Sequence, residues 1–139
     1  MIVYLDSSVI MRQLLGGPSR WQGWGTWEAA YSSVIMRIEC LRTADHLRMT
    51  GALDDEQRSR LGAMIETVCD VLTLVPLDAV ILNRAAQSFP TVVGTLDALH
   101  LATTLSLSER DGIAAAFATH DQQQARAAVG LGLQVIAWR

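Results

Sequence analysis

IVYLDSSVI, residues 2–10, places a short apolar run directly before an aspartate and two serines, and a second apolar run follows them. The first run, residues 2–5, has the length of a buried strand. From Val9 onward the apolar residues recur at helical spacing, and a GGP sequence then stops the helix. The stretch therefore predicts a strand, a tight turn at Asp6 and a helix.

The order of a short apolar strand followed by a helix is repeated along the chain. Further strands are expected at residues 29–31, 72–75, 113–118 and 133–137, and further helices at residues 34–41, 54–72, 78–87, 95–107 and 122–129. Such alternation predicts a parallel sheet with helices on both faces. We therefore expect an α/β fold of three layers, α/β/α, with a central parallel sheet in a single domain of residues 1–139.

The helix after the second predicted strand has an expected cap and an expected buried face. Ser33 is a candidate N-cap. Apolar residues at helical spacing predict one buried face, formed by Val34, Ile35, Ile38 and Leu41.

The charge balance limits the classes of partner. The chain has 14 acidic and 11 basic residues and a net charge of −3, and every basic residue is arginine. It lacks the basic excess of proteins that hold nucleic acids by bulk charge, so any polyanion must bind locally. No stretch approaches the roughly 18 apolar residues of a membrane span, and Asp6 interrupts the run that a signal peptide needs. We expect a cytoplasmic protein with no membrane partner.

Four acidic residues are candidates for one functional site. In an open parallel sheet, ligands bind beyond the carboxyl ends of the strands. Asp6 and Asp121 follow predicted strands, Asp97 opens a helix, and Glu39 lies about two turns into another helix. All four can converge if these helices flank the first strand.

Each acid also has an alternative structural role. Asp6 and Asp121 could cap helices, and Asp97 could interact with its helix dipole. Glu39 could pair with Arg42, three residues away, on a solvated face.

Four segments carry these acids: YLDSSVI (4–10), SSVIMRIECLRT (32–43), GTLDALHLAT (94–103) and FATHDQQQARAA (117–128). Their order and spacing resemble the four acidic motifs of PIN-domain ribonucleases, in particular the VapC-type toxins of prokaryotic toxin-antitoxin pairs. The resemblance covers essentially the whole chain and implies a PIN-like α/β/α domain.

The resemblance also implies roles for individual residues. Asp6, Glu39, Asp97 and Asp121 would form an acidic quartet, with Asp6 and Asp97 as the principal magnesium ligands. Thr119 would lend a hydroxyl to the same site. The implied reaction is endonucleolytic hydrolysis of RNA phosphodiesters.

The chemistry of the acids agrees with these roles. Mg²⁺ takes oxygen ligands and is usually held by one or two carboxylates while it keeps several waters. We expect Mg²⁺ as the cofactor, with Mn²⁺ able to replace it, because a bound cation relieves repulsion among crowded carboxylates and activates water for attack on phosphorus. Ser7 could support this site from outside the ligand set or cap the first helix. The residues alone predict only an acid cluster suited to Mg²⁺.

Two other functions remain open. A receiver-like or aspartyl-phosphate phosphohydrolase domain would use Asp6 as a nucleophile, but that pattern needs a second acid two residues later, where the chain has Ser8. A catalytically degenerate PIN-like binding module is the other alternative, and the presence of all four acids argues against it.

The resemblance implies three partners: an RNA substrate, a small antitoxin protein and a second copy of the chain in a homodimer. Trp21, Trp24 and Trp27 recur every third residue, and we interpret them first as a partner surface, with core filling and base stacking as alternatives. His100, one turn beyond Asp97, is interpreted as a structural imidazole.

Overall fold

The computed structural model describes residues 1–137, which form a parallel five-stranded sheet in the order β3-β2-β1-β4-β5. All four strand pairs are parallel. The strands are β1 Ile2–Leu5, β2 Ala29–Ser33, β3 Thr73–Val75, β4 Ala116–Ala118 and β5 Val135–Ile136. The helices are α1 Ser7–Leu15, α2 Ile35–Met49, α3 Asp55–Val71, α4 Ala79–Ala85, α5 Thr95–Asp111 and α6 Gln122–Gly130.

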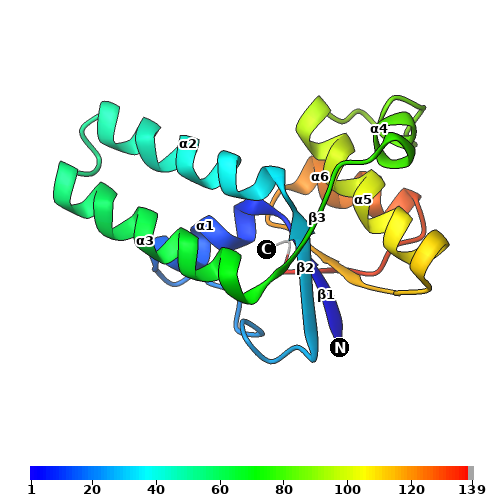
Figure 1. Ribbon diagram of the computed structural model, residues 1–139, viewed down its shortest axis with the longest axis horizontal. Helices are drawn as coiled ribbons and strands as arrows, with labels where there is room; N and C mark the ends of the chain where they lie inside the picture. The colour runs from blue at the N-terminus through cyan, green and yellow to red at the C-terminus, as the bar shows by residue number, and fades with distance from the viewer. Residues whose placement is uncertain (138–139) are drawn as a thin grey trace.

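The helices form a layer on each face of the sheet. Figure 1 shows α1, α2 and α3 on one side and α4, α5 and α6 on the other. Side chains of the central strand β1 alternate between these layers: Val3 and Leu5 belong to a core with α1–α3, whereas Tyr4 belongs to a core with α5 and α6. The predicted three-layer α/β fold is confirmed.

The strand order changes direction at β1. The chain passes from β1 to β2 and β3 on one side, and then returns to place β4 on the other side of β1. Connections therefore leave β1 and β4 in opposite directions, which is the arrangement that opens a ligand site in parallel sheets.

The expected buried face of α2 is only partly confirmed: Leu41 packs against the core, and Ile35 is half-buried. Val34 is 39% exposed and Ile38 is 59% exposed, whereas Met36, Cys40 and Ala44 are buried. These three residues, spaced by four, belong to the core shared with α1 and α3, so packing between helices selected a face rotated from the expected one.

The expected cap of α2 also differs by one residue. Strand β2 continues to Ser33, and the N-cap is Val34. The Ser33 hydroxyl nevertheless accepts a hydrogen bond from the Ile35 amide at 3.2 Å.

The three tryptophans pack against the core that α1–α3 share with β1, which supports the core-filling alternative; the partner surface stays a prediction for their exposed parts. The Trp24 and Trp27 rings meet edge-on at 5.1 Å, and the Trp21 and Trp27 rings stack at 6.0 Å. All three are partly buried against the core that contains Val3 and Val9.

Two remaining expectations concern element lengths and the membrane. The fourth strand covers only Ala116–Ala118 of the expected 113–118, because α5 continues to Asp111 and Gly112 ends it with a left-handed φ of 67°.

No helix within residues 1–137 is long and apolar enough to cross a bilayer.

Candidate functional site

Asp6 and Asp121 lie at the carboxyl ends of adjacent strands. Asp6 follows β1 and caps α1, and Asp121 follows β4 and caps α6. The two strands pair with Leu5 opposite Ala118, and the Asp6 amide donates to the Ala118 carbonyl at 3.0 Å. The fold therefore brings the two segments together, and both acids do serve as helix caps.

The carboxylate of Asp6 is buried and held by three different groups. Its Oδ2 accepts a hydrogen bond from the Ser8 amide at 3.1 Å and lies 3.4 Å from the Thr119 hydroxyl. Its Oδ1 lies 3.4 Å from the Gln124 side-chain amide, which can donate to it. These contacts come from α1, the loop after β4, and α6, so the orientation of Asp6 depends on the packed fold.

Thr119 connects the surroundings of Asp6 and Asp121. Its buried hydroxyl lies 2.7 Å from Gln124 Oε1 and accepts a hydrogen bond from the Asp121 amide at 3.0 Å. Through these contacts Thr119 orders the loop that carries Asp121.

Ser8, rather than Ser7, supplies the nearby serine hydroxyl. Ser8 Oγ accepts a hydrogen bond from the His120 amide at 3.0 Å and lies 3.4 Å from the Thr119 hydroxyl. Among residues 1–137, the Ser7 hydroxyl takes part in no hydrogen bond of this kind. Ser8 therefore contacts the loop after β4, while the supporting role expected for Ser7 stays a prediction.

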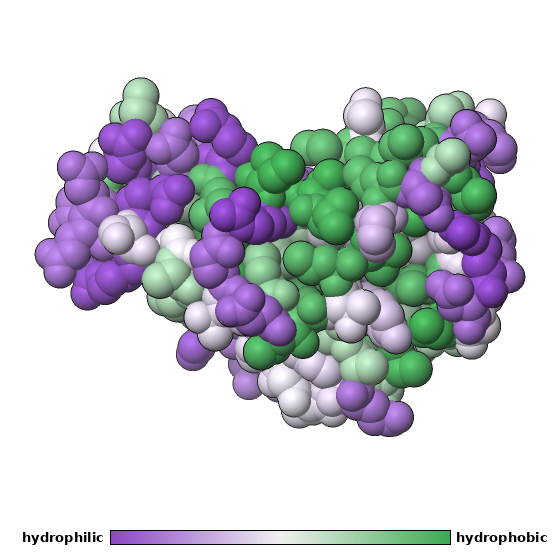
Figure 2. All heavy atoms as spheres, in the orientation of Figure 1, coloured by the Kyte–Doolittle hydropathy of each residue, from purple (hydrophilic) through white to green (hydrophobic). Residues whose placement is uncertain are grey.

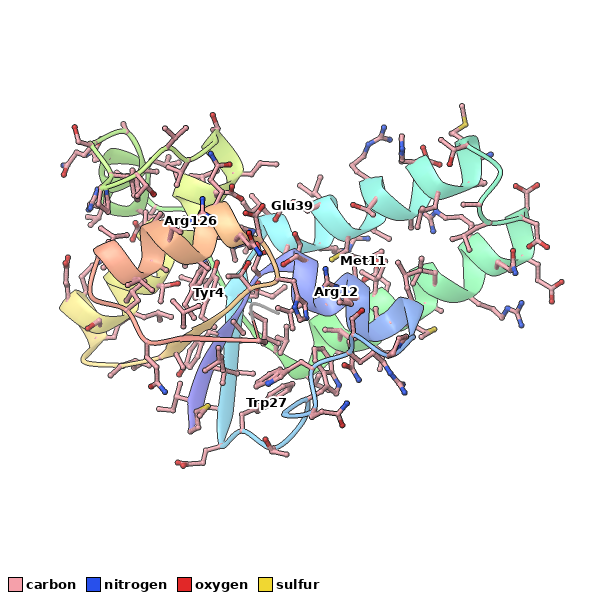
Figure 3. All side chains as sticks on the ribbon, turned by 180° about the vertical axis from the view of Figure 1, so that it is seen from behind. Tyr4, Met11, Arg12, Trp27, Glu39 and Arg126 are labelled. Carbon is pink, nitrogen blue, oxygen red and sulfur yellow. The ribbon has the colours of Figure 1, made fainter. Side chains whose placement is uncertain are left out.

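Glu39 turns into the interior instead of pairing with Arg42. Its Oε1 lies 2.5 Å from His100 Nε2, whereas Arg42 contacts Asp45. His100 Nε2 also lies 3.6 Å from Asp6 Oδ1. The solvated ion pair considered for Glu39 is thus absent, and Glu39 belongs to the same cluster as Asp6. Figure 3 shows Glu39 near the start of α2, at the carboxyl end of the sheet.

The pKa of Asp97 is raised by burial and by the charges of the other three acids. Its half-buried position raises its pKa to about 6, and the negative charges of Asp121, Asp6 and Glu39 add to this increase while His100 opposes it. Asp97 lies in the first turn of α5. The structure therefore brings all four sequence-predicted acids into one electrostatically connected cluster.

His100 is the main site residue that the sequence interpretation missed. It is fully buried, and its Nδ1 lies 2.7 Å from the Tyr4 hydroxyl while its Nε2 contacts Glu39. Burial acts to lower the pKa of His100, but the hydrogen bond that its ring donates to Glu39 and the charges of Asp6, Glu39 and Asp97 together raise it. Burial and the Asp6 charge raise the pKa of Tyr4.

A signal for these supporting residues was present in the sequence. His100 lies three residues after Asp97, and Gln124 lies three residues after Asp121. Residues with this spacing share one face of a helix. A polar residue at that position can therefore point into the same site as the acid.

The side-chain oxygens of the site suit a Mg²⁺ ion that keeps several of its waters, rather than an ion held by protein ligands alone. Within the described residues, no three His, Cys, Asp or Glu side chains are already arranged to hold one ion. Mg²⁺ needs only one or two carboxylates when it keeps its waters. Asp6 and Asp97 can provide these oxygen donors, while Glu39 contacts His100.

Comparisons by sequence find no matching family model and no matching curated protein. The structure, in contrast, is similar to a chain of a toxin-antitoxin complex from Klebsiella pneumoniae, with a TM-score of 0.66, 14% identity, and coverage of 96% of this chain and 95% of that chain.

A second similar chain comes from VapBC2 of Rickettsia felis bound to a DNA fragment from its promoter, with a TM-score of 0.67 and 12% identity. The alignment covers 98% of both chains. The chain therefore shares its fold with proteins of two toxin-antitoxin complexes, as the resemblance implied.

Proposed function

We propose that the chain is a metal-dependent endoribonuclease and the toxin of a type II toxin-antitoxin pair. The observation that carries this proposal is the meeting of Asp6 and Glu39 at His100 Nε2, at 3.6 Å and 2.5 Å, beside the Thr119 hydroxyl that also contacts the Asp121 amide. The raised pKa of Asp97 supports it, because burial and the charges of these acids both contribute to that increase. Four carboxylates gathered at the carboxyl end of a parallel sheet repel one another, and a bound cation would relieve this repulsion. A purely structural role would leave their repulsion unrelieved.

Mg²⁺, or Mn²⁺ in its place, would be held by Asp6 and Asp97, with Glu39 and Asp121 completing the negative site. The ion would supply positive charge for a phosphodiester and lower the pKa of water. The protein's own contribution is orientation: hydrogen bonds from Ser8 and the packing of Thr119 and Gln124 fix the Asp6 carboxylate before the ion arrives.

A basic side chain on the helix that Asp121 caps supports a polyanionic substrate. Arg126 lies on α6, the helix that Asp121 caps, and with Gln122 and Val135 it lines an open hollow of about 560 Å³. Figure 3 shows Arg126 and Glu39 on the same upper side of the molecule in that view. Since the chain is acidic overall, a local arginine provides the charge that an RNA backbone requires.

The surface has features suited to protein partners, for which we propose a small antitoxin and a second copy of the chain. Figure 2 shows apolar side chains gathered over the side of α4 and α5, whereas the α2–α3 hairpin is hydrophilic. An open groove of about 640 Å³ in the α4–α5 region is lined by Leu82, Phe89, Val92 and Leu99, among others. Exposed apolar surfaces of this kind serve in protein association. Light scattering tests the homodimer, and a mass of 15.2 kDa, that of one chain, would contradict it.

The nuclease is tested with protein purified in chelator and then supplied with Mn²⁺. Single-stranded RNA of mixed sequence and total tRNA serve as substrates, because the target is not specified by the site. Asp97→Asn should abolish cleavage by removing one principal ligand. Asp111→Asn is the matched control, since Asp111 lies exposed at the other end of α5. Cleavage by Asp97→Asn at the wild-type rate would refute the site, and RNA binding without cleavage by the wild type would favour a degenerate binding module.

A further inference from the structure

We propose that Tyr4 and His100 form a hydrogen-bonded relay that positions the Glu39 carboxylate at the acidic site. The inference rests on the proposed nuclease function and assigns roles to two residues outside the acidic quartet. His100 and Tyr4 are positioning residues here, because they act on the site through Glu39.

Both nitrogens of the His100 ring are engaged. Nδ1 lies 2.7 Å from the Tyr4 hydroxyl, and Nε2 lies 2.5 Å from Glu39 Oε1. If the ring is neutral, the Tyr4 hydroxyl donates to Nδ1 and leaves the proton on Nε2. If the ring is charged, both nitrogens donate. In either state Nε2–H donates to Glu39, so the relay does not depend on the protonation of His100.

The ring of Tyr4 is itself fixed by packing. It is buried, stacks on Phe117 with an interplanar angle of 8° and a centroid distance of 5.6 Å, and meets the His100 ring edge-on at 5.7 Å. Tyr4 lies on the central strand, between β2 and β4. The hydroxyl therefore has little freedom, and its contact sets the rotation of the imidazole.

Glu39 is the acid that most needs such support. Asp6 and Asp121 are held as helix caps by backbone amides, and Asp97 lies in the first turn of α5. Glu39 instead comes from within α2 on a long side chain, whose conformational freedom costs free energy to restrict. The bond from His100 restricts it before any ion or substrate is present.

The relay also joins the two helical layers. Glu39 belongs to α2, which packs with α1 and α3, whereas His100 belongs to α5 on the opposite face of the sheet. The Glu39–His100 contact crosses the carboxyl end of the sheet between these layers. A histidine that only filled the core would not require a carboxylate partner from the other layer.

The first test is Mn²⁺ affinity, measured by electron paramagnetic resonance of the free ion in the absence of RNA. His100→Asn can still reach Tyr4 but is too short to reach Glu39, and we expect it to weaken Mn²⁺ binding about 10- to 100-fold, the usual effect of losing an outer-shell partner. His100→Gln places an amide donor near the former Nε2 and should recover most of this loss. Tyr4→Phe should weaken binding less than His100→Asn, and Tyr31→Phe, a tyrosine of β2, is the matched control without effect.

The second test needs no metal and follows the imidazole N–H protons of the apo protein by NMR. A buried Nε2–H bonded to a carboxylate should give a slowly exchanging, low-field proton signal. Glu39→Gln should shift that signal upfield, and Tyr4→Phe should make it exchange faster. A signal that ignores both substitutions overturns the relay, as does wild-type Mn²⁺ affinity in folded His100→Asn and Tyr4→Phe.

The two proposals fail in different ways. If the wild type binds no Mn²⁺ and cuts no RNA, the nuclease proposal fails, and the relay fails with it as a device for metal binding even if the NMR signal is present. If the wild type binds Mn²⁺ and cuts RNA but the relay variants match it, only the relay is wrong. Melting curves in chelator identify any variant that has not folded, and Tyr4→Phe or His100→Gln then decides the result.

Discussion

Asp97→Asn should stabilise the metal-free protein at neutral pH while it removes activity. The pKa of Asp97 is raised from 3.8 to about 6, first by burial and then by the charges of Asp121, Asp6 and Glu39. The folded protein therefore binds a proton more tightly than the unfolded chain at this position. Consequently the contribution of Asp97 to the free energy of unfolding falls as the pH rises from about 3.8 to about 6, and it stays low above that range.

The magnitude follows from the size of the pKa change. A shift from 3.8 to about 6 corresponds to about 3 kcal/mol without screening. Because Asp97 is only half-buried, solvent reduces both the cost of its burial and the repulsion from the other acids, and about 1 kcal/mol is the expected effect. Asparagine keeps the size of the side chain and has no charge, so the free energy of unfolding of the variant should not fall in this way as the pH rises.

Urea unfolding in chelator at pH 4.5 and pH 7.5 measures the effect. The free energy of unfolding of Asp97→Asn minus that of the wild type should be about 0.7 kcal/mol larger at pH 7.5 than at pH 4.5, because about a third of the effect is already present at pH 4.5. Asp111→Asn controls for the loss of a carboxylate from α5 outside the cluster. If the difference between Asp97→Asn and wild type is the same at both pH values, the carboxylates do not act on one another as described, and the crowded site is wrong.

Three further outcomes are expected. Mn²⁺ should raise the melting temperature of the wild type, and at a concentration 100 times the Kd it should stabilise the fold by about 2.7 kcal/mol. Asp6→Asn should lose most of this response. A wild-type melting temperature that does not change with Mn²⁺ would count against a preformed site. Glu39→Gln should weaken Mn²⁺ binding and slow RNA cleavage, because its carboxylate faces the site, and an unchanged metal requirement and rate would remove Glu39 from it. Trp27→Ala should lower the free energy of unfolding by about 2 kcal/mol, less than for a fully buried tryptophan, with Mn²⁺ affinity unaltered in calorimetry; strong loss of a partner complex without loss of stability would support the partner-surface interpretation.

The first strand, the turn and the first helix were readable from the sequence because their signals are local. Residues 2–5 are apolar, Asp6 can cap a helix, and apolar residues then recur at helical spacing. The alternation of such units also predicted the parallel sheet and its three layers, since a parallel connection needs a crossover and a helix usually provides it. Repetition of this pattern was enough for the fold class.

Helix faces were less predictable where several apolar residues compete for one core. Val34 and Ile38 are larger and more apolar than Ala44, yet Ala44 is buried and Ile38 is exposed. The contact of α2 with α3 and α1 decided the outcome, and those helices come from other parts of the sequence. The tryptophans illustrate the same limit, because their burial depends on the space left beside α1 and β1.

The sequence by itself determined which acids were available, and their positions after strands and near helix starts placed them at one end of the sheet. Only the tertiary structure decided how they interact: Glu39 turns from Arg42 to His100, Tyr4 contacts His100, and burial together with the charges of three carboxylates raises the pKa of Asp97. The physical reason is that capping and periodicity act over a few residues, whereas a buried hydrogen bond and the energy between charges depend on distances between side chains up to about a hundred positions apart.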